Sequence, residues 1–135
     1  MTSRFTSEIA VRPDDIDMFQ HVHNSRYLDY VQAARYDQMI RCYKMSMEEF
    51  MITGYGFVVK RAEINYKRPL IMGDIMLIST QVKEFNGSDI TVEFEIVNKK
   101  KEKVCCDGQM LYTMINLKTG RSEKISEEVQ TKFLI

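Results

Sequence analysis

The order of helical and strand-like stretches is the feature that most constrains the fold of this chain. Residues 24–43 contain no glycine or proline and permit one helix of about five turns. One strand-like stretch precedes it at residues 4–12, and others follow at residues 56–69, 74–85, 89–96 and 104–117. A run of strands after a single long helix indicates an α+β architecture, in which one sheet packs on that helix.

Turn and capping signals support a sheet connected by hairpins. Asn86-Gly87 is the strongest hairpin-turn signal in the chain, and the alternation from Asp89 to Ile96 predicts a half-buried strand directly after it. Ser46 and Glu49 match a capping box, which predicts a short helix over residues 46–53. A further short helix is expected to start near Ser126.

The predicted long helix carries apolar residues on two sides. They lie on one side in its first half and on roughly the opposite side in its second half: Tyr27, Tyr30, Val31 and Ala34, then Tyr36, Met39, Ile40 and Tyr43. A helix on a protein surface keeps one apolar stripe, so we expect this helix to be enclosed by the sheet. A single helix leaves the sheet edges and outer face uncovered, which favours a homodimer or homotetramer.

Length and charge set broad limits on the kind of protein. The 135 residues fit one domain, residues 1–135, and the 19 basic and 19 acidic side chains balance, so no global field favours nucleic acid or a membrane surface. The basic run at residues 99–103 is either a solvated hairpin tip or a contact for an anionic ligand. We expect neither nucleic acid nor a membrane as a partner.

The cysteines and the N-terminal residues predict the compartment. The three cysteines form no CxxC pair, which is typical of reduced thiols. The first residues show no apolar stretch of a secretory signal, and no apolar run approaches the ~20 residues that span a bilayer. We therefore expect a soluble cytoplasmic protein.

Polar and titratable residues gather just before the predicted helix. Asp15, Asp17, His21, His23 and Asn24 fall within ten residues, in the stretch DIDMFQHVHN. Such a cluster is either helix-capping and turn chemistry or the centre of an active site. His-x-His beside carboxylates is also a possible metal-ligand pattern, but the stretch offers no evident fourth ligand, and we expect no metal.

Two segments carry a resemblance to a known family. The pattern Asp15-x-Asp17, His21-Val22-x-Asn24-x-x-Tyr27, then Ala34-Arg35, resembles the active-site signature of hotdog-fold acyl thioesterases of the 4-hydroxybenzoyl-CoA and acyl-ACP thioesterase superfamily. The segment AEINYKRPLIMGD (residues 62–74) is similar to a structural stretch of the same superfamily. The resemblance spans essentially the whole chain and implies the hotdog fold, an antiparallel five-stranded sheet wrapped around one long central helix.

The resemblance assigns a role to Asp17. In the family the second aspartate of the pair attacks the thioester carbonyl or activates a water. An aspartate of ordinary pKa, ~3.9, is ionised at neutral pH, and a thiolate leaving group needs little general acid help because its conjugate acid has a pKa of ~8.5. The alternative is that Asp17 only caps a turn.

The resemblance also gives roles to Asn24 and His21. The backbone N–H near Asn24 would stabilise the oxyanion at the helix start. The other interpretation, that the Asn24 side chain is the N-cap, is compatible with this role, because a cap that fixes the helix start also positions the donor. His21 would orient the carboxylate or the water, or share proton transfer; alternatively, it is satisfied by backbone groups in a loop. His23 and Phe19 depart from the acyl-ACP branch of the family, and we interpret His23 as structural.

Three functional hypotheses remain open. The first is hydrolysis of an acyl-CoA or acyl-ACP thioester without a cofactor. The second is a hotdog dehydratase or hydratase, whose catalytic histidine is followed by glycine and proline, whereas residues 24–27 here read Asn-Ser-Arg-Tyr. The third is a non-catalytic acyl-binding module of the same fold. Acyl chain length and the choice of carrier are not determined by any residue pattern.

Overall fold

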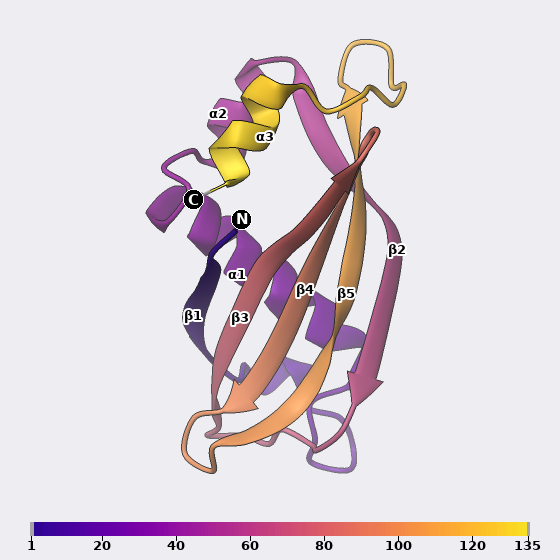
Figure 1. Cartoon of the computed structure of the whole chain (residues 1–135). Helices are drawn as coiled ribbons and strands as arrows, with labels where there is room; N and C mark the ends of the chain where they lie inside the picture. The colour runs from indigo at the N-terminus through magenta and orange to yellow at the C-terminus, as the bar shows by residue number, and fades with distance from the viewer. Residues whose placement is uncertain (1, 135) are drawn as a thin grey trace.

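A five-stranded antiparallel sheet curves around one long helix in the computed structural model, which describes residues 2–134 (Figure 1). The strands are β1 (Arg4–Ala10), β2 (Tyr55–Tyr66), β3 (Ile75–Asn86), β4 (Asp89–Asn98) and β5 (Lys103–Asn116). The helices are α1 (Tyr27–Arg41), α2 (Met47–Ile52) and α3 (Glu127–Phe133), with 3₁₀ turns η1 (Pro13–Asp15) and η2 (Asn24–Arg26). The strand order β1-β3-β4-β5-β2 leaves β1 and β2 at the edges.

The central hairpin confirms the strongest sequence signals. Asn86 pairs with Asp89 across the turn, and Gly87 has a φ of 64°, a conformation that glycine adopts without steric cost. Along β4 every second side chain is buried, beginning with Ile90, so the predicted half-buried strand is correct. These buried side chains form the floor on which α1 packs.

The two short helices begin at the predicted caps. The Ser46 Oγ accepts a hydrogen bond from the Glu49 N–H at 3.1 Å at the start of α2. The Ser126 Oγ accepts one from the Val129 N–H at 3.2 Å at the start of α3. Both helices cover one end of α1 (Figure 1), and Phe50 and Phe133 bury their rings there, each 1% exposed.

The buried face of α1 differs from the predicted one. Its buried residues form one stripe along the whole helix: Tyr27, Tyr30, Val31, Ala34, Arg35, Gln38 and Met39. Tyr36 and Ile40, predicted to be enclosed, are 45% and 48% exposed among the described residues. Met39 and Tyr43 of the second predicted set are buried, so the expectation of two enclosed sides was wrong for Tyr36 and Ile40, because the stripe continues through the polar residues Arg35 and Gln38 instead.

Gln38 enters the core because every polar atom of its amide has a partner. Its Nε2 donates to the Ser7 Oγ at 3.1 Å and to the Ile78 carbonyl at 3.3 Å. Its Oε1 accepts the hydroxyl hydrogen of Thr80. A buried amide is tolerated when it is hydrogen-bonded in this way, and this one ties α1 to β1 and β3.

Register shifts bend the sheet around the helix. The pairing slips between Val59 and Arg61 on β2, where Lys60 is an extra residue. A bulge of this kind increases the local twist, which helps β2 to curl over α1. It also places Val58 and Ala62 on opposite faces, although simple alternation predicts that they share one face.

Candidate active site

The polar cluster before α1 is a tight hairpin. The His23 N–H donates to the Asp15 carbonyl, and the Asp17 N–H donates to the His21 carbonyl, both at 2.8 Å. The Val22 N–H donates to the Leu70 carbonyl, also at 2.8 Å, which fastens the hairpin to the segment after β2. The fold therefore holds all the predicted site residues on one short, pinned segment at the start of the helix.

The Asp17 carboxylate has one engaged oxygen and one free oxygen. Oδ1 accepts hydrogen bonds from the backbone N–H groups of Phe19, at 2.9 Å, and of His21, at 3.3 Å. No hydrogen bond from residues 2–134 reaches Oδ2. The predicted turn-capping role is therefore present, and it fixes the carboxylate while leaving an oxygen available for chemistry.

His21 is joined to Asp17 only through the backbone. Its side chain is exposed, and within residues 2–134 its ring makes no hydrogen bond to the Asp17 carboxylate. The two residues pair across the hairpin, so their side chains leave the same small turn. The proposed orienting role of His21 therefore depends on a contact that forms with substrate or water.

The helix start is capped by His23 and not by Asn24. The His23 Nδ1 accepts a hydrogen bond from the Ser25 N–H at 3.1 Å and contacts the Ser25 Oγ at 2.7 Å. The predicted N-cap role of the Asn24 side chain is wrong, and the structural role of His23 is confirmed. The cap sits one residue earlier because the 3₁₀ turn η2 already begins at Asn24, so His23 is the extended residue before it and its side chain accepts from the second N–H of the turn.

Asn24 presents its backbone N–H at the start of η2. No acceptor among residues 2–134 takes this N–H, as is usual at a helix start. Its carbonyl accepts a hydrogen bond from the Tyr66 hydroxyl at 3.0 Å, which links the helix start to the end of β2. The unpaired N–H can donate a hydrogen bond to an oxygen on which negative charge develops.

Asp15 is the centre of a buried ionic network that the sequence did not reveal. It is 3% exposed, its Oδ2 accepts hydrogen bonds from the Tyr30 hydroxyl at 2.5 Å and from the Arg12 Nε at 2.9 Å, and the Arg26 Nε lies 3.5 Å from its Oδ1. Burial by itself would raise the pKa of Asp15, but the hydrogen bonds from Tyr30 and Arg12 lower it below its ordinary value. Tyr30, predicted only to pack, also fixes the hairpin.

Metal or thiol chemistry finds no support among residues 2–134. In this range no group of three or more His, Cys, Asp or Glu side chains could hold a metal ion. Cys42, Cys105 and Cys106 are all free thiols. Burial raises the pKa of Cys106 to about 12, so this thiol is a packing residue and not a nucleophile. In the same range no helix is both long and apolar enough to cross a bilayer.

The sheet wrapped on α1, with an aspartate hairpin at the helix start, defines the class as hotdog-fold thioester hydrolases. A family model described as the thioesterase-like superfamily matches residues 11–133, and the chain belongs to this superfamily.

Named relatives agree with this assignment. The chain is 29% identical over 126 residues to the long-chain acyl-CoA thioesterase FadM of Escherichia coli (strain K12), covering 93% of this chain and 94% of that one. The crystal structure of YbaW, a probable thioesterase from Escherichia coli, matches with a TM-score of 0.81 at 29% identity, covering 94% of each chain. A 1,4-dihydroxy-2-naphthoyl-CoA thioesterase from Synechocystis matches in fold, with a TM-score of 0.86 at 18% identity over 97% of this chain and 96% of that one.

Proposed function

We propose that the protein hydrolyses acyl-CoA thioesters with Asp17 as nucleophile or general base. The observation that carries the proposal is the Asp17 carboxylate, which two backbone N–H groups hold by one oxygen while the other oxygen has no partner among residues 2–134. The membership in the thioesterase-like superfamily supports it, as does the similarity to FadM, which is named a long-chain acyl-CoA thioesterase.

The reaction adds one water across the C–S bond. Either Asp17 attacks the thioester carbonyl carbon and water then hydrolyses the anhydride, or Asp17 takes a proton from the water that attacks. The C–S bond breaks, the thiolate leaves and takes up a proton, and the products are a free acid and a thiol. The Asn24 N–H would stabilise the oxyanion, and His21 would orient the attacking group or share the proton transfer.

The surroundings of the hairpin suit a CoA substrate. The lysine-rich turn between β4 and β5 lies at the same end of the sheet as the hairpin (Figure 1). Lys99 is paired with Glu8 at 2.6 Å, while Lys100, Lys101 and Lys103 form no ion pair with residues 2–134. These free cations are available to phosphate groups. Three free cysteines fit the reducing cytoplasm that we propose as the compartment.

Apolar surface beside Asp17 supports a homodimer or homotetramer. Met18 and Phe19, at the tip of the hairpin, are 85% and 72% exposed. The edge strand β2 is 12 residues long and exposes Val58 and Val59. Long exposed edges and apolar tips are usually covered by another chain, so a second copy is the occupant that we propose.

A thiol-release assay tests the catalytic proposal. We expect Asp17→Asn to lower kcat/KM on the best acyl-CoA by about 10²-fold or more, the usual loss for such a group. The asparagine keeps Oδ1 as an acceptor for the turn, so the variant should fold. Asp14→Asn, a neighbouring exposed aspartate, is the matched control and should stay within about twofold of the parent.

The assay should cover short, long and aromatic acyl-CoAs and one acyl-ACP. An Asp17→Asn variant as active as the parent would contradict the mechanism. Release from acyl-ACP alone would contradict the choice of CoA. If no thioester is cleaved by the parent protein, the non-catalytic acyl-binding hypothesis replaces the one proposed here.

A further inference from the structure

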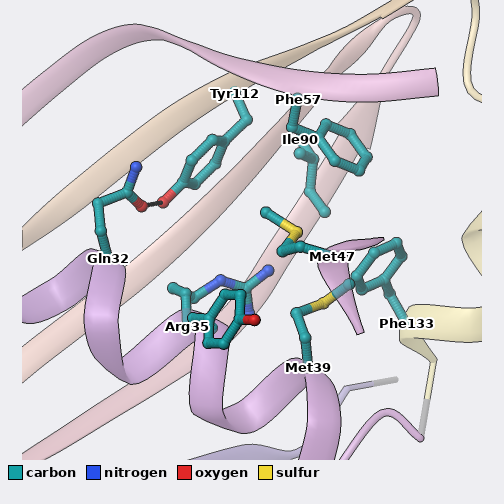
Figure 2. A pocket seen from close by; sticks show the side chains of 9 residues that line it. Gln32, Arg35, Met39, Met47, Phe57, Ile90, Tyr112 and Phe133 are labelled. Atoms are coloured by element: carbon teal, nitrogen blue, oxygen red, sulfur yellow. Dashed lines mark hydrogen bonds between the residues drawn. The ribbon is translucent and has the colours of Figure 1, made fainter. Parts of the chain in front are cut away.

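A cavity of about 210 Å³ lies between α1 and the sheet, away from the Asp17 hairpin. Figure 2 shows side chains from α1, three strands, α2 and α3 pointing into it. Most of the lining is apolar, including Met39, Met47 and Phe57, while Gln32, Arg35 and Tyr112 supply its polar groups. A cavity of about 150 Å³ holds a benzene molecule, so this one accommodates roughly eight non-hydrogen atoms.

Arg35 is the residue that points to a ligand. Its side chain lines the cavity and is only 9% exposed, and its Nη1 has no hydrogen-bond partner. Among residues 2–134 no carboxylate forms an ion pair with it; its guanidinium lies 5.6 Å from the centre of the Tyr43 ring. A cation–π contact compensates only part of the desolvation of a buried cation, which normally requires an anionic partner.

Two polar side chains near Arg35 are engaged with other residues. The Tyr112 hydroxyl donates to the Gln32 Oε1 at 2.7 Å, drawn as a dashed line in Figure 2. Glu48, on α2, accepts a hydrogen bond from the Tyr36 hydroxyl and does not reach Arg35. The polar side of the cavity thus offers the Arg35 N–H donors and the Gln32 amide hydrogens, a set that matches an oxygen acceptor, above all a carboxylate.

We propose that the cavity binds the carboxylate end of an aliphatic chain, with Arg35 as its ionic partner. Gln32 and Tyr36 are exposed at the solvent side, which gives a ligand a way in. The carboxylate has two possible sources. It belongs either to a free carboxylic acid, the class of product that thioester hydrolysis releases, or to the far end of an acyl group that carries a second carboxylate.

The second source rests on the proposed function and has a length requirement. Arg35 follows Asn24 by eleven residues, so the two lie roughly 16 Å apart along the helix at 1.5 Å per residue. Within one chain only a long acyl group can place its thioester at the Asp17 hairpin and its far carboxylate at Arg35. A free carboxylic acid, the first source, can bind at Arg35 without any hydrolysis of a thioester.

The binding test uses hexanoate, which has eight non-hydrogen atoms, as the probe. Met39 and Met47 line the cavity, so their ¹³C-labelled methyl groups report occupancy by NMR. We expect saturable shifts of these two signals with hexanoate, and at least tenfold weaker binding in Arg35→Leu, because a charge-assisted hydrogen bond is lost. Arg4→Leu, at an exposed arginine on β1, is the matched control and should bind as the parent does.

An uncharged probe keeps the test decisive if Arg35→Leu does not fold. On the parent protein, hexanamide should bind at least tenfold more weakly than hexanoate. Equal binding of hexanoate to the parent and to Arg35→Leu, equal binding of the two probes, or shifts only at methionines outside the cavity would each overturn the proposal. None of these measurements depends on hydrolytic activity, so a failure of the proposed function leaves them interpretable.

The two sources are separated by a kinetic comparison of hexadecanedioyl-CoA with hexadecanoyl-CoA. If the substrate supplies the carboxylate, the ratio of their kcat/KM values should fall at least tenfold in Arg35→Leu. If a free acid is the ligand, the ratio should stay constant while hexanoate binding is lost. A constant ratio together with unchanged hexanoate binding contradicts both sources.

Discussion

At the scale of single residues, two aspartates two positions apart have opposite environments. Asp15 is buried with Tyr30 and two arginines, while Asp17 keeps one oxygen free at the tip of the hairpin. The difference follows from their places in the chain: Asp15 ends the 3₁₀ turn η1 and faces Tyr30, whereas Asp17 lies past the paired residue Ile16 and opens the turn that closes at His21. Asp15 thus holds the loop in place, and Asp17 is the residue that we propose for chemistry.

The Asp15 network predicts a pH-dependent stability. The folded-state pKa of Asp15 is lowered, so its stabilising effect should be fully present above the unfolded value of ~3.9 and lost as the pH falls through the lower folded value. Asp15→Asn should reduce the free energy of unfolding at pH 7 by about 2 kcal/mol, less than for a fully buried pair, because Arg12 and Arg26 are each 49% exposed.

Urea denaturation at several pH values checks this prediction. Below pH 4 the parent and Asp15→Asn should converge in stability, since protonation of Asp15 removes the same charge. A constant stability difference from pH 7 to pH 3 would show that the ionised carboxylate is not the stabilising species.

The proposed oxyanion donor predicts a contrast between two substitutions at one position. Asn24→Ala keeps the backbone N–H and should retain most activity, whereas Asn24→Pro removes it and should lower kcat by about 10²-fold or more. Proline is favoured at the first position of a helix, and His23 has the extended conformation that precedes proline (φ −61°, ψ 136°). Circular dichroism should therefore show a folded variant, and equal loss in both variants would assign the role to the side chain.

At the scale of elements, α1 is positioned by polar residues within its buried stripe. Gln38 hydrogen-bonds to groups on β1 and β3, and Arg35, one turn earlier in the same buried stripe, lines the cavity. An apolar stripe alone would allow the helix to slide or rotate on the sheet. Directional bonds at Gln38 select one position, which in turn places the hairpin at the helix start.

Replacing Gln38 tests this positioning. Gln38→Leu fills a similar volume but leaves the Thr80 hydroxyl and the Ile78 carbonyl without their partner, which should cost about 2 kcal/mol of unfolding free energy. Urea denaturation measures the loss, and Gln130→Leu on α3 is the control for the same change in a less buried amide. A Gln38→Leu variant as stable as the parent would show that packing alone positions α1.

At the scale of the whole molecule, one side of the sheet is covered by α1 and one long edge remains open. β2 runs beside β5 on one side only, and its other edge has no partner among residues 2–134. Most residues of β2 are exposed, as expected for an edge strand whose outer N–H and C=O groups are unpaired. The assembly that we propose would cover this edge and the apolar hairpin tip together.

The assembly is measurable by light scattering. We expect a mass of at least twice the 15.9-kDa chain for the parent, and a monomer for Val58→Lys, because a charge on the edge disfavours strand pairing. Ile52→Lys, on α2 and 85% exposed, is the matched control and should keep the parent's mass. A parent protein that is already monomeric would remove the dimer from the proposal.

The sequence by itself determined the elements and the location of the cluster. Turn and cap signals such as Asn86-Gly87 and Ser46 are local, because they act through the backbone of a few neighbouring residues, and they predicted hairpins and helix starts correctly. The motif placed the candidate site on residues 15–24 for the same reason: its members are close in the chain.

Only the tertiary structure decided which polar residues are buried and what they contact. Asp15 is paired with Tyr30, fifteen residues later, and Gln38 with Thr80, so no local pattern reveals either partner. The bulge at Lys60 changes which side chains of β2 face the helix, and the cavity at Arg35 needs side chains from six elements. Burial is a property of the assembled core. The desolvation cost of the Arg35 guanidinium therefore depends on side chains that are far apart in the sequence.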